Sequence, residues 1–458
     1  MSHIMWVDYL IEDHRCPGHA QPSMVMTVKR NWAELDAGLP ILHAVRLARP
    51  RWRIVVIVQE ARMQMERDRF PALMRQLQAV ADTTVWLRHA PGSARKIKRT
   101  LPDGRRVPAL THVAQTLFSA ISAPLLGRRE HRTIESRTLP RGPVQALLHN
   151  HKAETPLERR LRRASPRALR IGFHHGSHPT VPGPDRAAPA QPSRGAPTDL
   201  FLAKTKDEAD LVHFPGRTPM IRTIGLPKYD GEWLNRLLPT QDQLDETEQF
   251  RQRHERCWLF LTRGPTNEAM DEGDYSELLS ALAKVLQKRP HVGLLVKPHP
   301  REDLEALRSV LPGEEGTDWM ITDQPPYALA RTTELTIAMW SSVILDAAAA
   351  GAPVIELYRF RHPSHYLAHL PGRRLGSTHA AMNLCTPARD EAELEAALTA
   401  WEEAGWDHAT WAPKRDAVRT LIGDRPGDAL AHTARVLGTA LPPDGTNNQR
   451  HNPRCPNS

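Results

Sequence analysis

The run RIVVIVQ, Arg53–Gln59, is the stretch that most clearly indicates the fold. It is short, apolar and rich in β-branched residues, which is typical of a buried strand in a parallel sheet. Met24–Lys29 and Thr83–Leu87 are further strand candidates, and Ala33–Leu47 and Ala61–Val80 have the apolar spacing of helices. The order β-α-β-α-β predicts a parallel sheet with right-handed crossovers.

The same alternation of strands and helices begins again near the middle of the chain. Strands are expected at Trp258–Thr262 and Val292–Lys297, with the helix Tyr275–Gln287 between them. The alternation continues to a last strand at Pro353–Leu357, and the polar helix Leu238–Arg253 is suited to bridge two units. We therefore expect an α/β fold with two Rossmann-like domains.

The predicted domains are residues 1–240 and residues 250–430. Residues 179–197 read PTVPGPDRAAPAQPSRGAP, and we expect a long loop there because proline fixes φ and removes a backbone donor. Residues 442–458 are polar and show no periodicity, so we expect a disordered tail.

Composition and charge limit the class of protein. The 458 residues carry a formal net charge of +9, which favours contact with phosphate-bearing partners. No apolar run approaches the ~20 residues of a membrane span, and Met1–Asp13 lacks the segments of a signal peptide. The four cysteines show no disulfide-framework or metal-binding spacing. We expect a cytoplasmic protein with neither a metal nor another cofactor.

Two histidine motifs follow predicted strands, and ligands bind at strand ends in open α/β sheets. In the first, His175 is followed by Gly176, which permits a sharp turn, and histidine suits a general base near neutral pH. In the second, Lys-Pro-His-Pro, the prolines stiffen the backbone around His299 and Lys297 offers a point charge for phosphate. The alternative interpretations are surface histidines in a loop and a rigid turn with a solvated lysine.

Hydroxyl and guanidinium groups follow two more predicted strands. Ser341 and Ser342 precede the small-residue helix Val343–Ala350, where hydroxyls can cap the helix and its N–H groups can bind an anion. A capped core helix is the alternative interpretation. Arg263 is a further candidate for a phosphate contact, although an exposed loop fits that position equally well.

Several motifs of other enzyme classes do not occur in the sequence. It contains no GxGxxG, no P-loop, no HExxH and no GxSxG. It also contains no Asp-x-Asp, the common metal-binding pair of one class of glycosyltransferases. These absences argue against P-loop, zinc-protease and serine-hydrolase chemistry.

Five segments in order form a pattern that resembles a known family: HHGS, TDLFLAKT, GLPKYD, VKPHP and WSSVILDAAAAGAPVI. They resemble the CDP-glycerol glycerophosphotransferase group that polymerises teichoic acids, and they are similar to the Kdo and sialic-acid transferases of capsule synthesis. The resemblance covers roughly Ala168 to Leu357. It implies the GT-B type of fold, in which two Rossmann-like domains face each other across a cleft, with an acceptor-side N-terminal domain and a nucleotide-donor C-terminal domain.

The resemblance also implies roles for individual residues. His175, before Gly176, matches the base that takes the proton of the acceptor hydroxyl. His299 matches a second histidine, which contacts the donor phosphate. Ser341 and Ser342 match the serine pair that holds the phosphates of the donor at a helix start.

A turn between the two domains completes the resemblance. Gly225, Pro227 and Asp230 match the Gly-x-Pro-Arg-x-Asp turn of the family, with Lys228 in the arginine position. Trp340 stands where the family has tyrosine, and the aspartate usually just before it is absent.

The implied function is a transferase that moves a glycosyl or glycerophosphate group from a CMP-, CDP- or UDP-activated donor. The acceptor would be a polysaccharide, a teichoic-acid-like polymer or a lipid-linked precursor. A nucleotide-sugar epimerase of the same fold and a non-catalytic scaffold are alternatives. Arg95–Arg99 and Arg159–Arg163 are basic and suggest peripheral contact with the inner membrane face, or simply solvated faces. No nucleic-acid partner is expected.

Overall fold

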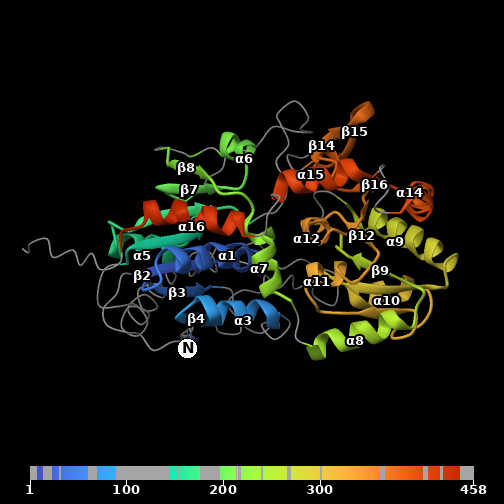
Figure 1. The fold of residues 1–458 in the computed structure, drawn as a ribbon, viewed down its shortest axis with the longest axis horizontal. Coiled ribbons are helices and arrows are strands. Elements are labelled where there is room, and N and C mark those ends of the chain that lie inside the picture. Colours follow the sequence, from blue (N-terminus) through green and yellow to red (C-terminus); the bar gives the residue numbers. More distant parts are fainter. Residues whose placement is uncertain are drawn as a thin grey trace, which may run out of the picture.

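The computed structural model describes residues 8–13, 23–29, 32–59, 70–88, 144–151, 154–175, 196–212, 214, 218–238, 241–265, 270–299, 302–361, 367–405, 411–422 and 427–443. Figure 1 shows two α/β units side by side, one built from blue and green elements and the other from yellow and orange ones. Within these residues no helix combines the length and the apolar character needed to cross a membrane.

The first sheet has eight strands in the order β1-β4-β3-β2-β5-β6-β7-β8. Its strands are β1 Asp8–Asp13, β2 Ser23–Val28, β3 Arg53–Val58, β4 Thr83–Arg88, β5 Ala146–Asn150, β6 Leu169–Phe173, β7 Leu200–Ala203 and β8 Met220–Thr223. All neighbours pair in parallel except β1, which runs antiparallel to β4 at the edge. The strand order reverses between β2 and β5, which makes the carboxyl ends of these strands a topological switch point.

Helices cover both faces of the first sheet, which explains why RIVVIVQ is apolar on both sides. The helices of this unit are α1 Trp32–Ala48, α3 Pro71–Val80, α5 Pro156–Ala164, α6 Lys206–Leu211, α7 Gly231–Arg236 and α16 Asp428–Ala440, with the 3-10 turn η3 at Pro227–Tyr229. Ile54 and Val56 pack with α1 and α3 on one face. Val55 and Ile57 pack with α5 on the other.

The second sheet has six parallel strands in the order β11-β10-β9-β12-β13-β16. These strands are β9 Arg256–Leu261, β10 Val292–Lys297, β11 Trp319–Ile321, β12 Leu335–Met339, β13 Val354–Leu357 and β16 Thr386–Ala388. Here the order reverses between β9 and β12. The unit also contains a hairpin of β14 Leu367–Leu370 and β15 Arg374–Ser377, joined by the 3-10 turn η4 at Pro371–Arg373.

Helices again lie on both faces of the second sheet. They are α8 Gln241–Gln252, α9 Glu272–Gln287, α10 Leu304–Val310, α11 Pro326–Ala330, α12 Ile344–Ala349, α13 Thr378–Ala381, α14 Glu391–Ala404 and α15 Ala412–Ile422. One core cluster contains Phe260 and Leu294 with residues of α9 and α14. The other contains Leu259 and Leu295 with residues of α8, α11 and α12.

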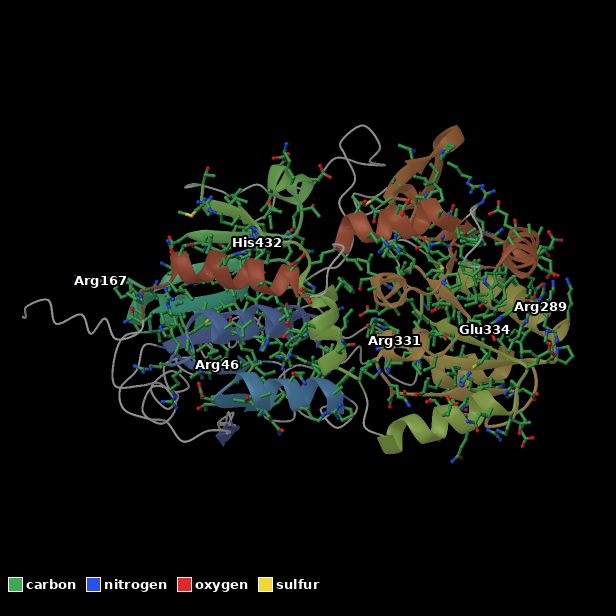
Figure 2. The ribbon with its side chains drawn as sticks, in the orientation of Figure 1. Arg46, Arg167, Arg289, Arg331, Glu334 and His432 are labelled. Carbon is green, nitrogen blue, oxygen red and sulfur yellow. The ribbon has the colours of Figure 1, made fainter. Side chains whose placement is uncertain are left out.

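The last described helix returns to the first unit. Leu430 and Leu437 of α16 are fully buried in the same core cluster as Leu42 of α1. Figure 1 shows α16, in red, beside the blue and green elements. His432, labelled on α16 in Figure 2, donates from Nε2 to the Thr223 carbonyl oxygen at 3.0 Å.

Most of the expected strands and helices are present, and the differences are local. The expected helix Ala61–Val80 appears as α3 from Pro71 onward, and residues 60–69 lie outside the described residues. Of the proline-rich stretch only residues 196 and 197 are described, and of the expected tail only residues 442 and 443. Gly176 and the basic segment Arg95–Arg99 also lie outside the described residues.

Candidate functional site

Arg263, Lys297 and the serine pair Ser341-Ser342 lie at the carboxyl ends of neighbouring strands of the second sheet. Arg263 comes two residues after β9, Lys297 ends β10, and the serines follow β12. β9 pairs with both β10 and β12, and the strand order reverses between β9 and β12. The switch point of an open parallel sheet is where such folds bind ligands.

The guanidinium group of Arg263 is fixed by Trp340. Its Nη1 donates to the Trp340 carbonyl oxygen at 3.0 Å. The guanidinium carbon also lies 4.5 Å from the centroid of the Trp340 ring, within range of a cation–π interaction. The tryptophan that replaces the tyrosine of the family pattern thus holds a positive charge directly beside the serine pair.

Lys297 reaches toward the neighbouring strand β11. Its Nζ lies 3.3 Å from Oδ1 of Asp323, which comes two residues after β11. The Asp323 side chain is 52% exposed, so the ion pair is open to water and to competing anions. A phosphate at this edge would compete with Asp323 for the lysine.

The half-buried carboxyl group of Glu302 holds the backbone N–H of His299 in place through Thr262. The His299 N–H donates to Thr262 Oγ1 at 3.2 Å, and Thr262 Oγ1 donates to Glu302 Oε2 at 2.5 Å. The hydroxyl of Tyr275 donates to the other oxygen of Glu302. Burial raises the pKa of Glu302, against the opposing effect of these hydrogen bonds. Glu302 was not singled out from the sequence, although it lies three residues after His299.

Ser341 and Ser342 differ from the expectation that their hydroxyls cap a helix. α12 begins at Ile344 and has no side-chain cap. The serines contribute their carbonyl groups instead, which accept from the N–H groups of Ile344 and Leu345 at 3.2 Å each. Ser341 is buried and Ser342 half-buried.

His175 lies on the other sheet, two residues after β6, and is half-buried. Its Nδ1 is 2.8 Å from Nδ2 of Asn150, the last residue of β5. The same Nδ2 donates to Glu34 Oε1 at 2.9 Å. The other oxygen of Glu34 accepts from the N–H of Lys29 at 2.5 Å.

Lys29 links the ends of the two strands, β2 and β5, that flank the switch point of the first sheet. Its Nζ donates to the Asn150 carbonyl oxygen at 3.0 Å and lies 3.1 Å from Glu158 Oε2. Because Lys29 follows β2 and Asn150 ends β5, these contacts span the reversal of strand order. Lys29, Glu34 and Asn150 were not expected as site residues. The position of Lys29 and Asn150 at strand ends could have pointed to these two, whereas Glu34 lies in helix α1 and carries no such signal.

His174 is engaged elsewhere. Its Nδ1 lies 3.1 Å from Glu208 Oε1, and its ring packs 5.6 Å from the ring of Phe201. Burial raises the pKa of Glu208, but Lys204 and His174 outweigh burial and hold this pKa at about 2. Burial also lowers the pKa of the neighbouring His151 to about 3. The two histidines of the HHGS motif therefore face different surroundings.

The turn that contains Lys228 joins the two units. Lys228 Nζ lies 2.8 Å from Asp36 on α1 and 3.6 Å from Asp346 on α12. Burial raises the pKa of Asp346 to about 6; Lys228 opposes this shift and Asp36 adds to it. The Tyr229 hydroxyl donates to the Ser342 carbonyl oxygen at 3.5 Å.

Asp230 and Gly225 shape this turn. Asp230 caps α7 by accepting from the Glu232 N–H, and it also accepts from the N–H groups of Gly427 and Leu430 at 2.5 and 3.1 Å. One carboxylate thereby fixes the starts of two helices. Gly225 has φ +75°, a left-handed conformation that favours glycine, and Pro227 is buried.

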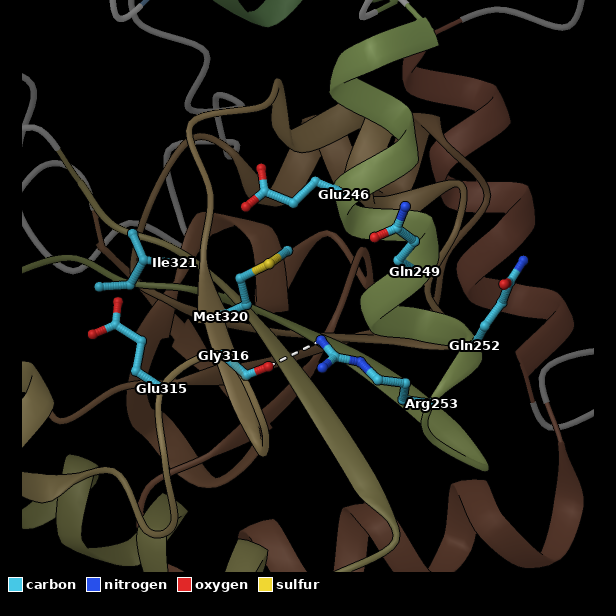
Figure 3. A pocket seen from close by; sticks show the side chains of 8 residues that line it. All are labelled: Glu246, Gln249, Gln252, Arg253, Glu315, Gly316, Met320 and Ile321. Carbon is cyan, nitrogen blue, oxygen red and sulfur yellow. Dashed lines mark hydrogen bonds between the residues drawn. The ribbon is translucent and has the colours of Figure 1, made fainter.

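A groove of about 650 Å³ lies away from all of these residues. It is lined by residues of α8, such as Gln249, and by Gly316, Met320 and Ile321 near β11 (Figure 3). Arg253 donates across it to the Gly316 carbonyl oxygen at 2.9 Å. None of the expected site residues lines this groove. Among the described residues no group of three or more His, Cys, Asp or Glu side chains is arranged to hold a metal ion.

No protein-family model matches the sequence. A comparison with curated proteins finds no match. Solved structures do match: the S. aureus MnaA–UDP structure has a TM-score of 0.54 at 9% identity and covers 90% of this chain and 94% of that one. The fold is of the GT-B type.

Two further structures agree with this fold. A putative UDP-N-acetylglucosamine 2-epimerase from Listeria monocytogenes has a TM-score of 0.54 at 12% identity, and covers 91% of this chain and 95% of that chain. The UDP-GlcNAc 2-epimerase from Methanocaldococcus jannaschii has a TM-score of 0.51 at 12% identity, and the match covers 91% of this chain and 99% of that chain. At such identities the likeness concerns the fold alone. The predicted α/β fold with two Rossmann-like units is confirmed.

Proposed function

We propose that this GT-B protein is a transferase that moves a glycosyl or glycerophosphate group from a CMP-, CDP- or UDP-activated donor to a polysaccharide, teichoic-acid-like or lipid-linked acceptor. One observation carries the proposal: Arg263, Lys297 and the serine pair converge at the switch point of the second sheet. Two cations and a helix start at one strand edge suit the phosphates of a nucleotide donor.

The positive charges would stabilise the leaving nucleotide. Arg263 is already held in place by Trp340, so it needs little reorganisation as negative charge develops on the phosphate. Lys297 would exchange Asp323 for the phosphate. His299 stands on a backbone fixed through Thr262 and Glu302, which suits a side chain that must contact the donor at a set angle. His175, on the facing sheet, would contact the acceptor end of the reaction.

The test of the donor site is a thermal-shift titration with CMP, CDP, UDP, CDP-glycerol, CMP-Kdo, CMP-sialate and UDP-GlcNAc. A ligand that binds only the folded state stabilises it by RT ln(1 + [L]/Kd), about 2.7 kcal/mol at a hundred times Kd. We expect stabilisation by one nucleotide family, and its loss in the double variant Ser341→Ala, Ser342→Ala.

Ser276→Ala is the matched control, because this exposed serine donates only to the Glu272 carbonyl oxygen of its own helix α9. It should respond to the nucleotide as the unmodified protein does. If no nucleotide stabilises the protein, the donor site is absent and the scaffold interpretation replaces the transferase. If the double variant keeps the full shift, the nucleotide binds elsewhere.

A nucleotide-sugar epimerase is the second candidate. Two observations favour it: the fold is shared with UDP-GlcNAc 2-epimerases, and Glu302 places a half-buried carboxyl group beside His299, where acid–base chemistry could use it. Incubation with UDP-GlcNAc in deuterium oxide, without acceptor, separates the two. An epimerase incorporates deuterium at the inverted carbon, whereas a transferase leaves the sugar unlabelled until an acceptor is added.

A further inference from the structure

We propose that Glu34 and Asn150 hold His175 in the tautomer that carries its hydrogen on Nε2, so that this side chain donates a hydrogen bond to a substrate oxygen. The tautomer follows from contacts within the ligand-free chain. Only the placement of a substrate at Nε2 rests on the proposed function. Glu34 and Asn150 are thus positioning residues, which act through His175.

The orientation of the Asn150 amide comes first. Its Nδ2 lies 2.9 Å from Glu34 Oε1, and an ionised carboxylate can only accept hydrogen bonds. The Lys29 N–H donates to the other oxygen of the same carboxylate. Glu34 is fully buried, and both of its oxygens face nitrogen donors. Asn150 must therefore present its NH₂ group, and not its oxygen, to Glu34.

The opposite orientation of the amide is unfavourable. It would place Oδ1 against the carboxylate of Glu34 and turn NH₂ toward the present position of Oδ1. That position is buried and offers Oδ1 no hydrogen-bond partner within the described part of the chain. A buried NH₂ without acceptors costs more than a buried carbonyl oxygen without donors, because it leaves two hydrogens unsatisfied.

The second amide hydrogen fixes the histidine. Nδ2 of Asn150 also lies 2.8 Å from His175 Nδ1, so Nδ1 is the acceptor in this contact. A neutral imidazole has one donor and one acceptor nitrogen, so the hydrogen of His175 sits on Nε2. Amide orientations and tautomers are assigned from such networks.

Further contacts of Asn150 and Lys29 hold the Asn150 amide in this orientation. Asn150 is fully buried at the end of β5, and its carbonyl oxygen accepts from Lys29 Nζ at 3.0 Å. Lys29 is in turn paired with Glu158, whose Oε1 accepts from Thr27 Oγ1 at 2.5 Å. These contacts tie the ends of adjacent strands β2 and β5 to the loop after β6.

The consequence concerns the chemistry of His175. A general base needs an unprotonated nitrogen that points at the proton it removes. Here Nε2 already carries a hydrogen, and Nδ1 is occupied by Asn150. His175 is therefore built as a hydrogen-bond donor to an anionic or carbonyl oxygen of the substrate. This role replaces that of the base, which the family resemblance implies.

The test is ¹⁵N NMR of the histidine-labelled, ligand-free protein, with the His175 signals assigned through the variant His175→Gln. The two ring nitrogens of a neutral imidazole differ in ¹⁵N shift according to which one carries the hydrogen. We expect the unprotonated signal at Nδ1. A hydrogen on Nδ1 in the unmodified protein would overturn the proposal.

A double variant, Glu34→Gln with Asn150→Asp, exchanges the hydrogen-bond donor and acceptor at these two positions and keeps the net charge constant. The amide that replaces the Glu34 carboxylate can accept from the Lys29 N–H through its oxygen. Its NH₂ group can donate to the carboxylate that replaces the Asn150 amide, and this new carboxylate only accepts. The hydrogen of His175 should therefore move to Nδ1, and an unchanged tautomer in the folded variant would also overturn the proposal.

Two further outcomes keep the test decisive. If the double variant does not fold, the spectrum of the unmodified protein still decides. Nucleotide binding at the second sheet should be unchanged in the folded variant, so failure of the proposed function remains separately visible.

Discussion

At the residue scale, two carboxyl groups, the buried Glu34 and the half-buried Glu302, position groups of the candidate site. Neither belongs to a motif of the sequence. Glu34 acts on His175 through Asn150, and Glu302 acts on the His299 backbone through Thr262. In both cases a carboxyl group orders a chain of donors, which fixes the ring of His175 and the backbone N–H of His299 before any ligand binds.

His175→Ala should lower turnover by about 10²-fold or more, since a positioned proton donor or acceptor contributes at least that much. Nucleotide binding at the second sheet should stay within a factor of about two. Steady-state kinetics with the donor identified by thermal shift, together with the thermal-shift Kd, measures both quantities. Turnover equal to that of the unmodified protein would remove His175 from the site.

Tyr275→Phe should destabilise the fold by about 1–3 kcal/mol, because it leaves one oxygen of the half-buried Glu302 without its donor. Urea unfolding followed by circular dichroism gives this difference. Tyr327→Phe is the matched control: Tyr327 is also buried, but its hydroxyl makes no hydrogen bond within the described residues. Equal losses in both variants would mean that the Glu302 contact contributes nothing.

At the element scale, aspartate carboxylates accept hydrogen bonds from the first N–H groups of helices α7, α10 and α16. The alternation of strands and helices in the sequence does not reveal these contacts. Asp303 caps α10, a local contact within three residues of sequence. Asp230 caps α7 and also accepts from the N–H groups of Gly427 and Leu430 at the start of α16. The cap of α10 follows from a short motif. The bonds from Asp230 to α16 instead join residues that are 197 and 200 positions apart in the sequence.

Asp230→Ala should therefore lower the free energy of unfolding by more than Asp303→Ala does. A lost N-cap costs about 1 kcal/mol, and Asp230→Ala in addition leaves the donors at the start of α16 without their acceptor. We expect about 2–4 kcal/mol for Asp230→Ala and about 1 kcal/mol for Asp303→Ala, both from urea unfolding. Equal losses would show that α16 does not depend on Asp230.

At the scale of the whole molecule, the two units are connected by charge as well as by the chain. Lys228 lies between Asp36 of the first unit and Asp346 of the second. Arg331, labelled in Figure 2, adds a hydrogen bond from Nη1 to Asn235 Oδ1 on α7 at 3.4 Å. One lysine thus faces two carboxylates, which leaves one negative charge in excess at a partly buried junction.

This excess charge predicts a pH dependence. Burial, with Asp36 beside it, raises the pKa of Asp346 from 3.8 to about 6, so the folded protein holds a proton there that the unfolded chain releases. The associated stability is present below pH 3.8 and is lost as the pH rises to about 6. Asp346→Asn removes this titration. The stability of the unmodified protein relative to Asp346→Asn should therefore fall across this window.

Urea unfolding of both proteins at steps between about pH 4 and 7 measures the difference. A gap between the two proteins that stays constant with pH would show that Asp346 titrates normally. Asp323→Asn is the control, because the Asp323 side chain is 52% exposed, whereas Asp346 is buried.

Local periodicity by itself determined the class of fold. β-branched runs such as RIVVIVQ and VGLLVK, alternating with amphipathic stretches, are sufficient because a strand buried on both faces must be apolar throughout. Motifs at the ends of those runs also placed Arg263, Lys297 and the serine pair at one edge, since the carboxyl ends of parallel strands meet there. That much follows from interactions between residues near in sequence.

Only the tertiary structure decided which side chains control the candidate site. The contacts of Glu34 with Asn150, of Asn150 with His175 and of Lys228 with Asp346 join residues more than 20 positions apart. The return of α16 to the first unit is equally non-local, because Leu430 and Leu437 complete a core in which most of the other residues lie between Met24 and Leu237. Such partners are selected by three-dimensional packing and by the need to satisfy buried polar groups, and neither requirement leaves a periodic signal in the sequence.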